Sequence, residues 1–134
     1  MTANVYVDSN ILIYTVDGAP DLKAAAQLAV TSHLIRGDRL FSSELALGEC
    51  LRGAGPHLTA SLRAFADMFD DKAFLTAATV TRPVIVRAAQ LGNELNLKLI
   101  DAIHVATAEA LSCSVFLTND RGIRAPAGIE IRHI

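Results

Sequence analysis

Tryptophan is absent from this sequence of 134 residues, and aromatic residues make up only 5% of it. The two tyrosines and five phenylalanines form no series on which bases could stack, which disfavours an RNA-recognition-motif or OB-type binding module. Charge is also modest, because 12 basic and 14 acidic residues give a net charge of −2. The sequence therefore has no bulk basic surface that would indicate a nucleic-acid partner.

Cysteines and long apolar runs are scarce as well. Cys50 and Cys113 form no CxxC pair and the four histidines are scattered, which argues against a zinc site. Both cysteines lie in apolar helical patterns, so we expect reduced core thiols in a cytoplasmic protein. The longest stretch without a charge, residues 24–35, is far shorter than the roughly 18 residues of a membrane span. No basic residue precedes an apolar stretch at the N-terminus, so we expect neither a membrane segment nor a secretory signal.

The composition does provide a core, because 51% of the residues are hydrophobic. The length is typical of one domain, and we expect residues 1–134 to form a single one. The patterns predict short strands and longer helices in alternation. Strands are expected over 5–7, 40–41, part of 74–80, 115–117 and 129–131, and helices from 9, over 21–37, 45–53, 56–70, 81–95 and 99–111. This alternation predicts an α/β fold with a central, mainly parallel sheet of four or five strands flanked by helices.

The segment 56–70 is the most clearly amphipathic part of the chain. Its apolar side chains fall on one helical stripe, which we interpret as part of the core. The stripe consists of Leu58, Leu62, Phe65 and Phe69.

Four of the 14 acidic residues stand in unusual places. Asp8 and Asp120 directly follow apolar strands, and in open α/β sheets ligands bind beyond the carboxyl ends of the strands. Glu49 and Asp101 each lie within an otherwise apolar helical run. A helix cap explains Asp8 or Asp101 equally well when each is taken singly, and a turn explains Asp120. Capping does not explain Glu49.

A carboxylate in apolar surroundings is unfavourable unless it is paired, protonated or bound to a metal. Several of them converging without His or Cys would form an all-oxygen site, which suits Mg²⁺ or Mn²⁺. The natural substrate of such a site is a phosphate ester. Setting the four acids aside leaves ten acidic residues against 12 basic ones, which is compatible with an RNA substrate.

These residues together resemble the PIN-domain family of ribonucleases, and most closely its VapC-type toxins. The resemblance is carried by four segments in order, which together cover essentially the whole chain. They are 5–12 (VYVDSNIL), 42–52 with its helical Glu, 99–108 (LIDAIHVATA) and 116–122 (FLTNDRG). The resemblance implies a Rossmann-like PIN domain that gathers the four acids at one edge of the sheet. It also implies Mg²⁺- or Mn²⁺-dependent endoribonuclease activity on RNA, a homodimer and a dedicated antitoxin as partner.

The mechanism that follows from this resemblance is metal-assisted hydrolysis. Asp8 and Asp101 would hold the principal metal ion, and Asp120 would join them directly or through water. Glu49 would orient or deprotonate the attacking water, or join the coordination shell. In-line attack at phosphorus would leave a 3′-hydroxyl and a 5′-phosphate. Some family members carry a further acid after the fourth segment, whereas here Arg121 follows Asp120.

The polar neighbours of the acids each have two interpretations. Ser9 and Thr118 either hydrogen-bond ligands or cap helices. Asn10 and Asn119 either orient the acids or form turns. His104 lies one helical turn after the third acid, and we interpret it as a structural histidine or a support for a ligand.

Basic residues near these segments are candidates for contacts with phosphate, which give affinity without sequence choice. Arg52 lies one turn beyond Glu49, where it could meet a phosphate or pair with an acid. Lys98, Arg121 and Arg124 are further candidates. Glu44, by contrast, is expected to be an exposed acid at a helix start.

Three alternatives stay open at this point. A PIN nuclease of RNA processing would carry the same motifs without being a toxin. A phosphatase with Asp8 as covalent nucleophile is disfavoured, since that chemistry usually needs a second aspartate at position 10, where Asn10 stands. A catalytically silent metal-binding interaction domain is disfavoured by the complete set of acids.

Overall fold

The computed structural model describes residues 1–55 and 59–134 of the chain. In these residues the elements follow one another as β1 (Asn4–Val7), α1 (Ser9–Asp17), α2 (Pro20–Ile35), β2 (Arg39–Ser43), α3 (Glu44–Ala54), α4 (Thr59–Asp70), β3 (Thr76–Ala78), α5 (Arg82–Leu95), α6 (Leu99–Ala110), β4 (Val115–Leu117) and β5 (Glu130–Arg132). The expected start of the fourth helix at Pro56, and Leu58 of its apolar stripe, lie outside the described residues.

The strands form one parallel sheet with the order β3-β2-β1-β4-β5. The predicted α/β fold with a parallel sheet is confirmed, and the sheet has five strands. From the central β1 the chain moves to β2 on one side and later returns to β4 on the other. The edge beyond the carboxyl ends of β1 and β4 is therefore a topological switch point, the place where such sheets bind ligands.

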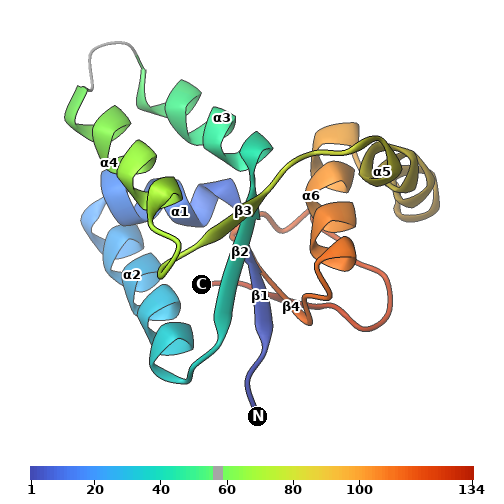
Figure 1. Cartoon of the computed structure of the whole chain (residues 1–134), viewed down its shortest axis with the longest axis horizontal. Coiled ribbons are helices and arrows are strands. Elements are labelled where there is room, and N and C mark those ends of the chain that lie inside the picture. Colours follow the sequence, from blue (N-terminus) through green and yellow to red (C-terminus); the bar gives the residue numbers. More distant parts are fainter. Residues whose placement is uncertain (56–58) are drawn as a thin grey trace.

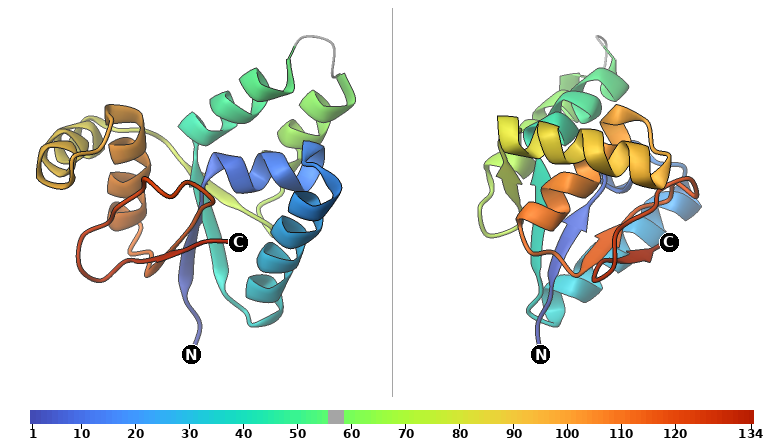
Figure 2. Two further views of the ribbon diagram at one scale, coloured as in Figure 1. Left: turned by 180° about the vertical axis from the view of Figure 1, so that it is seen from behind. Right: turned by 90° about the vertical axis from the view of Figure 1, so that its right-hand side faces the viewer.

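Helices cover both faces of the sheet (Figure 1). One core lies between the sheet and α1, α2, α3 and α4, and the other lies between the sheet and α5 and α6. Side chains of β1 alternate between them, since Val5 and Val7 belong to the first core and Tyr6 to the second. The side view in Figure 2 shows α5 and α6 lying across the second face.

Side-chain caps begin three of the described helices. The side chains of Asp8, Ser43 and Thr81 cap α1, α3 and α5. The cap interpretation of Asp101 is wrong, because α6 already begins at Leu99 and Asp101 lies in its first turn. Several expected boundaries also shift by one or two residues, and two helices show why.

The first shift concerns α2, which spans Pro20–Ile35 rather than 21–37, while Gly37 turns the chain with φ 85°. The second concerns α3, which continues through Gly53 and ends at Ala54. Gly55, with φ 73°, supplies the left-handed backbone that ends this helix.

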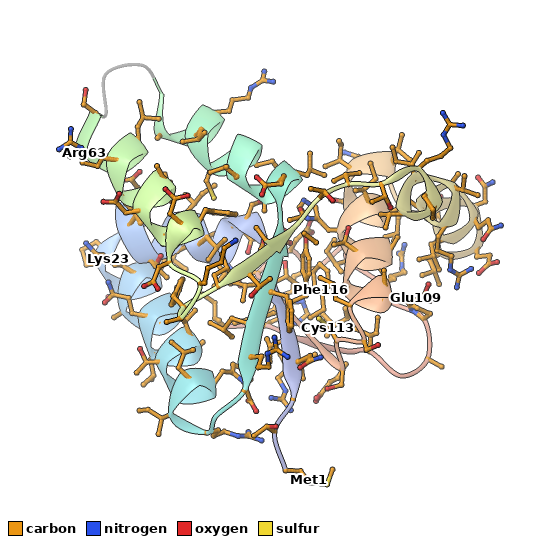
Figure 3. The ribbon with its side chains drawn as sticks, in the orientation of Figure 1. Met1, Lys23, Arg63, Glu109, Cys113 and Phe116 are labelled. Carbon is orange, nitrogen blue, oxygen red and sulfur yellow. The ribbon has the colours of Figure 1, made fainter. Side chains whose placement is uncertain are left out.

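The second core holds the sheet and the α5–α6 pair together. Phe116 and Cys113 lie between β4 and α6 (Figure 3). Arg87 of α5 donates to both carboxylate oxygens of Glu109 on α6, at 2.7 and 3.0 Å. The fork joins α5 to the last turn of α6, while the buried side chains of the second core hold the two helices together.

The structure also places three individual residues that the sequence singled out. Both cysteines are free and buried, and burial raises the pKa of each thiol to about 12. Glu44 is exposed in the first turn of α3. Within the described helices, none combines the length and apolar character that a membrane crossing requires.

Candidate active site

The four acids come from four segments that meet at the carboxyl edge of the sheet. Asp8 follows β1, Asp120 follows β4, Glu49 sits on α3 directly after β2, and Asp101 sits in the first turn of α6. In Figure 1, β1 and β2 rise towards α1 and α3, and α6 begins at the same end. The parallel topology thus delivers each acid to the same side of the molecule.

Asp8 is the most buried of the four, with 5% of its surface exposed. Its Oδ1 accepts the backbone N–H of Ser9 at 2.8 Å, which is the cap of α1. Its Oδ2 accepts the hydroxyl of Thr118 at 2.7 Å and the side-chain amide of Asn10 at 3.2 Å. Three donors therefore fix both carboxylate oxygens, so the cap role and the positioning role coexist.

Thr118 ties the end of β4 to the end of β1. Besides donating to Asp8, its Oγ1 accepts the Asn10 amide at 3.2 Å and the backbone N–H of Asp120 at 3.0 Å. The backbone N–H of Asn119 donates to Asn10 Oδ1 at 3.0 Å, while Asp120 Oδ1 accepts the Gly122 N–H at 2.8 Å. Thr118 and Asn10 orient the acids, and Asn119 acts through its backbone.

Asp101 is half-buried, and no donor of the described residues hydrogen-bonds its carboxylate. Burial raises the pKa of this carboxyl group, and the negative charges of Asp120 and Asp8 raise it further. His104 and Lys98 act in the opposite direction but do not cancel these effects. Asp101 is thus placed in the repulsive field of two other predicted site acids.

Glu49 faces the same region from α3. Its Oε1 lies 2.6 Å from Nε2 of His104, and its side chain is 35% exposed. The hydrogen bond from His104 lowers the pKa of Glu49 against the opposing effect of burial, with smaller help from the His104 charge and the Ser9 hydroxyl. His104 therefore contacts one of the four acids directly.

The imidazole of His104 interacts electrostatically with three of the four acids. Burial alone would lower the pKa of His104, but the bond to Glu49 and the charges of Asp8, Glu49 and Asp101 raise it. The raised pKa of His104 is consistent with a pocket in which negative charge is in excess.

The four carboxylates share an edge and an electrostatic field rather than a closed coordination shell. Over the described ranges, no three Asp, Glu, His or Cys side chains are gathered tightly enough to hold a metal ion as they stand. The donor set nevertheless fits a hard divalent cation, because all four candidate ligands are carboxylates. A positive charge between Asp8, Asp101 and Asp120 would also relieve the repulsion that raises the pKa of Asp101.

The basic candidates differ in how they are placed. Arg52 is exposed and lines a groove of about 490 Å³ together with Glu49, Leu45 and Ile100. Lys98 is exposed and acts electrostatically on Asp101. Arg121 is exposed next to Asp120 and forms no ion pair with a described residue.

Arg124 is placed differently from the other basic candidates. It donates to the backbone carbonyls of Leu95 and Asn96, at 3.1 and 3.4 Å. It thereby supplies hydrogen bonds to carbonyl groups at the C-terminal end of α5.

Two residues of the site were not identified from the sequence. The hydroxyl of Tyr6 lies 2.6 Å from Nδ1 of His104 and donates to Ser43 Oγ at 3.1 Å. A tyrosine within an apolar strand gives a weak signal, since a buried phenol needs a partner. That partner cannot be deduced, because the contacts join residues 98 and 37 positions apart.

The family assignment follows from a match over most of the chain. The PIN domain family model matches residues 5–129, and the chain belongs to that family. Among the curated proteins, none matches the sequence significantly.

Solved structures share the fold at low sequence identity. The VapBC2 complex of Rickettsia felis, bound to a DNA fragment from its promoter, matches with a TM-score of 0.70 and 15% identity, over 97% of this chain and 98% of that one. DNA-bound VapBC of Salmonella typhimurium gives 0.67 and 18%, over 99% and 98%. VapC20 of Mycobacterium tuberculosis, described as a toxin that cleaves the sarcin-ricin loop, gives 0.66 and 14%, over 84% and 86%.

Proposed function

We propose that this chain is a Mg²⁺- or Mn²⁺-dependent endoribonuclease and the toxin of a toxin–antitoxin pair. The observation that carries the proposal is the position of Asp101, whose carboxyl pKa is raised beside Asp120 and Asp8 at the switch point of a PIN domain. Burying or crowding carboxylates in this way is unfavourable for the fold alone, so the arrangement indicates a cation-binding role.

The acids have distinct proposed roles. Asp8 and Asp101 would hold the principal cation, with Asp120 as a further ligand directly or through water. Glu49 would join the shell, or orient the attacking water and take its proton. A bound divalent cation would supply positive charge to the scissile phosphate and lower the pKa of a coordinated water. Hydrolysis would leave a 3′-hydroxyl and a 5′-phosphate.

The substrate path proposed here is the groove beside Glu49. Its volume of about 490 Å³ could admit a nucleotide. Leu45 and Ile100 offer an apolar surface, the carboxylates of Glu44 and Glu49 would face a bound cation rather than phosphate, and the Arg52 guanidinium would contact a phosphate. The net charge of −2 does not oppose RNA binding, because the four site acids account for more than this excess.

The proposed partners rest on the likeness in fold to VapBC complexes. We infer that a cognate antitoxin binds this chain, and that the chain acts as a homodimer in the cytoplasm. The two free, buried cysteines are consistent with a reducing compartment. Co-expression with the product of an adjacent small gene, followed by purification of the complex, tests the partner.

The decisive experiment is expression of the wild type and of Asp101→Asn, followed by sequencing of the RNA ends. We expect defined cuts with Mg²⁺ or Mn²⁺ from the wild type, none with EDTA, and none from the variant. Asp67→Asn is the matched control, because Asp67 is an exposed acid of α4 outside the site, and it should cut like the wild type.

Two outcomes would contradict the assignment. Cleavage by Asp101→Asn at the normal rate would contradict the proposed metal site. RNA cuts that persist in EDTA would contradict the proposed metal dependence. Growth arrest on expression of the wild type alone distinguishes a toxin from a nuclease of RNA processing, which carries the same motifs.

A further inference from the structure

A chain of four hydrogen-bonded side chains runs from the second core into the candidate active site. It starts at Ser43 at the end of β2, continues through Tyr6 of β1 and His104 of α6, and ends at Glu49 of α3. The three contacts measure 3.1, 2.6 and 2.6 Å. Side chains of β2, β1 and α6 are therefore linked to a single carboxylate on α3.

One end of this series of hydrogen-bonded side chains is buried, and the other end reaches solvent. Ser43 and Tyr6 are fully buried, and His104 is 2% exposed. The Glu49 side chain, at 35%, is the member that reaches solvent. Buried polar groups are unfavourable unless they are hydrogen-bonded, so three of them in a row indicate a requirement beyond filling space.

Packing by itself explains only the ring of Tyr6. The ring stacks on Phe116 with centroids 5.0 Å apart, and Tyr6 is in register with Phe41 on one side and Phe116 on the other. A phenylalanine would fill this position equally well. The phenolic hydroxyl contributes the contacts to His104 and Ser43. Both contacts are links in the hydrogen-bonded series that ends at Glu49.

The protons along the chain are satisfied in either state of the imidazole. A protonated ring donates to Glu49 through Nε2 and to Tyr6 through Nδ1, and Tyr6 then donates to Ser43. In a neutral ring Nε2–H still donates to Glu49, while Nδ1 accepts from Tyr6 and Ser43 turns its hydroxyl to Tyr6. Ser43 Oγ also accepts the Ala46 N–H at 3.2 Å, which anchors the inner end at the first turn of α3.

We propose that Tyr6 and Ser43 are positioning residues for the reaction, which hold the His104 ring so that its Nε2–H fixes one oxygen of Glu49. The carboxylate is then held in one orientation towards the attacking water and the cation. This inference rests on the proposed nuclease function. Outer partners of this kind typically change activity or metal affinity by about 10-fold to 100-fold.

The test is Tyr6→Phe, which keeps the stacked ring and removes the hydroxyl. We expect kcat for RNA cleavage to fall about 10-fold with KM unchanged, because the variant leaves the exposed RNA-facing residues intact. Tyr14→Phe is the matched control, since Tyr14 of α1 lies in the first core and should behave like the wild type.

A double-mutant cycle separates positioning from a general structural effect. In a Glu49→Ala background Tyr6→Phe should cause no further loss, because its effect passes through Glu49. The cycle is read in the single-turnover cleavage rate and in Mn²⁺ affinity measured by electron paramagnetic resonance. Equal losses in both backgrounds, or no loss in either, would overturn the positioning role.

Failure of the proposed function has a different signature. A wild type that neither cleaves RNA nor binds Mn²⁺ overturns the function, and the positioning role with it. Should Tyr6→Phe not fold, His104→Gln and His104→Asn answer the same question. The longer glutamine can still donate to Glu49 and should retain more activity than asparagine, whereas equal loss would overturn the proposal.

Discussion

The hydroxyl of Thr118 donates to Oδ2 of Asp8 across 2.7 Å, joining two residues that are 110 positions apart in the chain. The bond connects the ends of β1 and β4, the neighbouring strands at the switch point of the sheet. Both residues are almost fully buried, so the bond is protected from water. The orientation of Asp8 thus depends on how β1 and β4 pair.

Thr118→Val tests this dependence. The valine keeps the shape but removes the donor to Asp8 and the acceptor for the Asp120 N–H, so we expect a loss of about 1–3 kcal/mol in the free energy of unfolding. Cleavage should fall about 10-fold because Asp8 is less well held. Urea unfolding and RNA cleavage measure the two effects.

The control for this variant is Thr107→Val. Thr107 is equally buried, but its hydroxyl donates to the Ile103 carbonyl of its own helix. The Thr107→Val variant should cleave RNA at the wild-type rate, whatever its free energy of unfolding. Normal cleavage by Thr118→Val would show that Asp8 does not need this bond.

Asp101→Asn should stabilise the metal-free fold while removing activity. The carboxylate is partly buried beside Asp120 and Asp8, and the amide removes one of the three repelling charges. Urea unfolding at pH 7 in EDTA should give a higher midpoint than the wild type, and cleavage should fall at least about 100-fold. The exposed Asp67→Asn should leave both quantities unchanged, and a lower midpoint for Asp101→Asn would contradict the repulsion.

The fold could be predicted from the sequence because its signals are local. Apolar triplets such as 115–117 followed by capping residues identify the strands, and their alternation with helices implies the parallel sheet. The predicted helix ends were less accurate, because a glycine's backbone conformation cannot be read from its type. Gly53 and Gly55 are alike in sequence, but only Gly55 adopts a positive φ.

The site could be predicted only in part, because its contacts are not local. The placement of four acids relative to strands and apolar runs identified them as candidates, and the spacing from Asp101 identified His104 as a neighbour of the site. The partners Tyr6 and Ser43 depend on the register of β1 with its neighbours, which composition and periodicity do not encode. Likewise, only the structure shows that Arg124 is engaged with the end of α5.

Asp38, which precedes β2 at the end of the strand opposite to the site acids, gives the fold a pH dependence of its own. Burial opposes ionisation, but hydrogen bonds from His33 and the Ala3 N–H, with the charge of Arg36, lower the pKa of this carboxyl group. Because the unfolded chain then binds more protons than the native one, stability rises with pH across this window. The contribution is complete above the ordinary aspartate pKa of about 3.9 and is lost as pH falls through the lower native value.

Asp38→Asn tests this prediction. At pH 7 we expect the variant to lose about 1.5–3 kcal/mol of unfolding free energy, the range for a hydrogen-bonded charged group. The difference from the wild type should shrink as the pH falls below about 4. Asp21→Asn, at an exposed position of α2, should show no comparable pH-dependent difference. A gap that stays constant down to acidic pH would assign the loss to packing rather than to ionisation.

Arg52→Gln tests the proposed path of the RNA along the groove. Arg52 is exposed beside Glu49, so removing its charge should weaken RNA binding without disturbing the acids. We expect KM to rise about 3-fold to 10-fold with kcat retained, and the slope of log affinity against log salt to fall by about 1. Fluorescence anisotropy across a salt series measures the slope, with Ca²⁺ in place of Mg²⁺ to suppress cleavage.

Arg63→Gln removes an equivalent charge from α4, on the far side of the molecule from α5 and α6 (Figure 3). Since both variants change the net charge equally, a general electrostatic effect would shift both by the same amount. A path through the groove requires Arg52→Gln alone to lose affinity. Equal shifts for the two variants would place the RNA elsewhere, and a loss of kcat in Arg52→Gln would instead indicate that Arg52 acts on Glu49 or on the reacting phosphate.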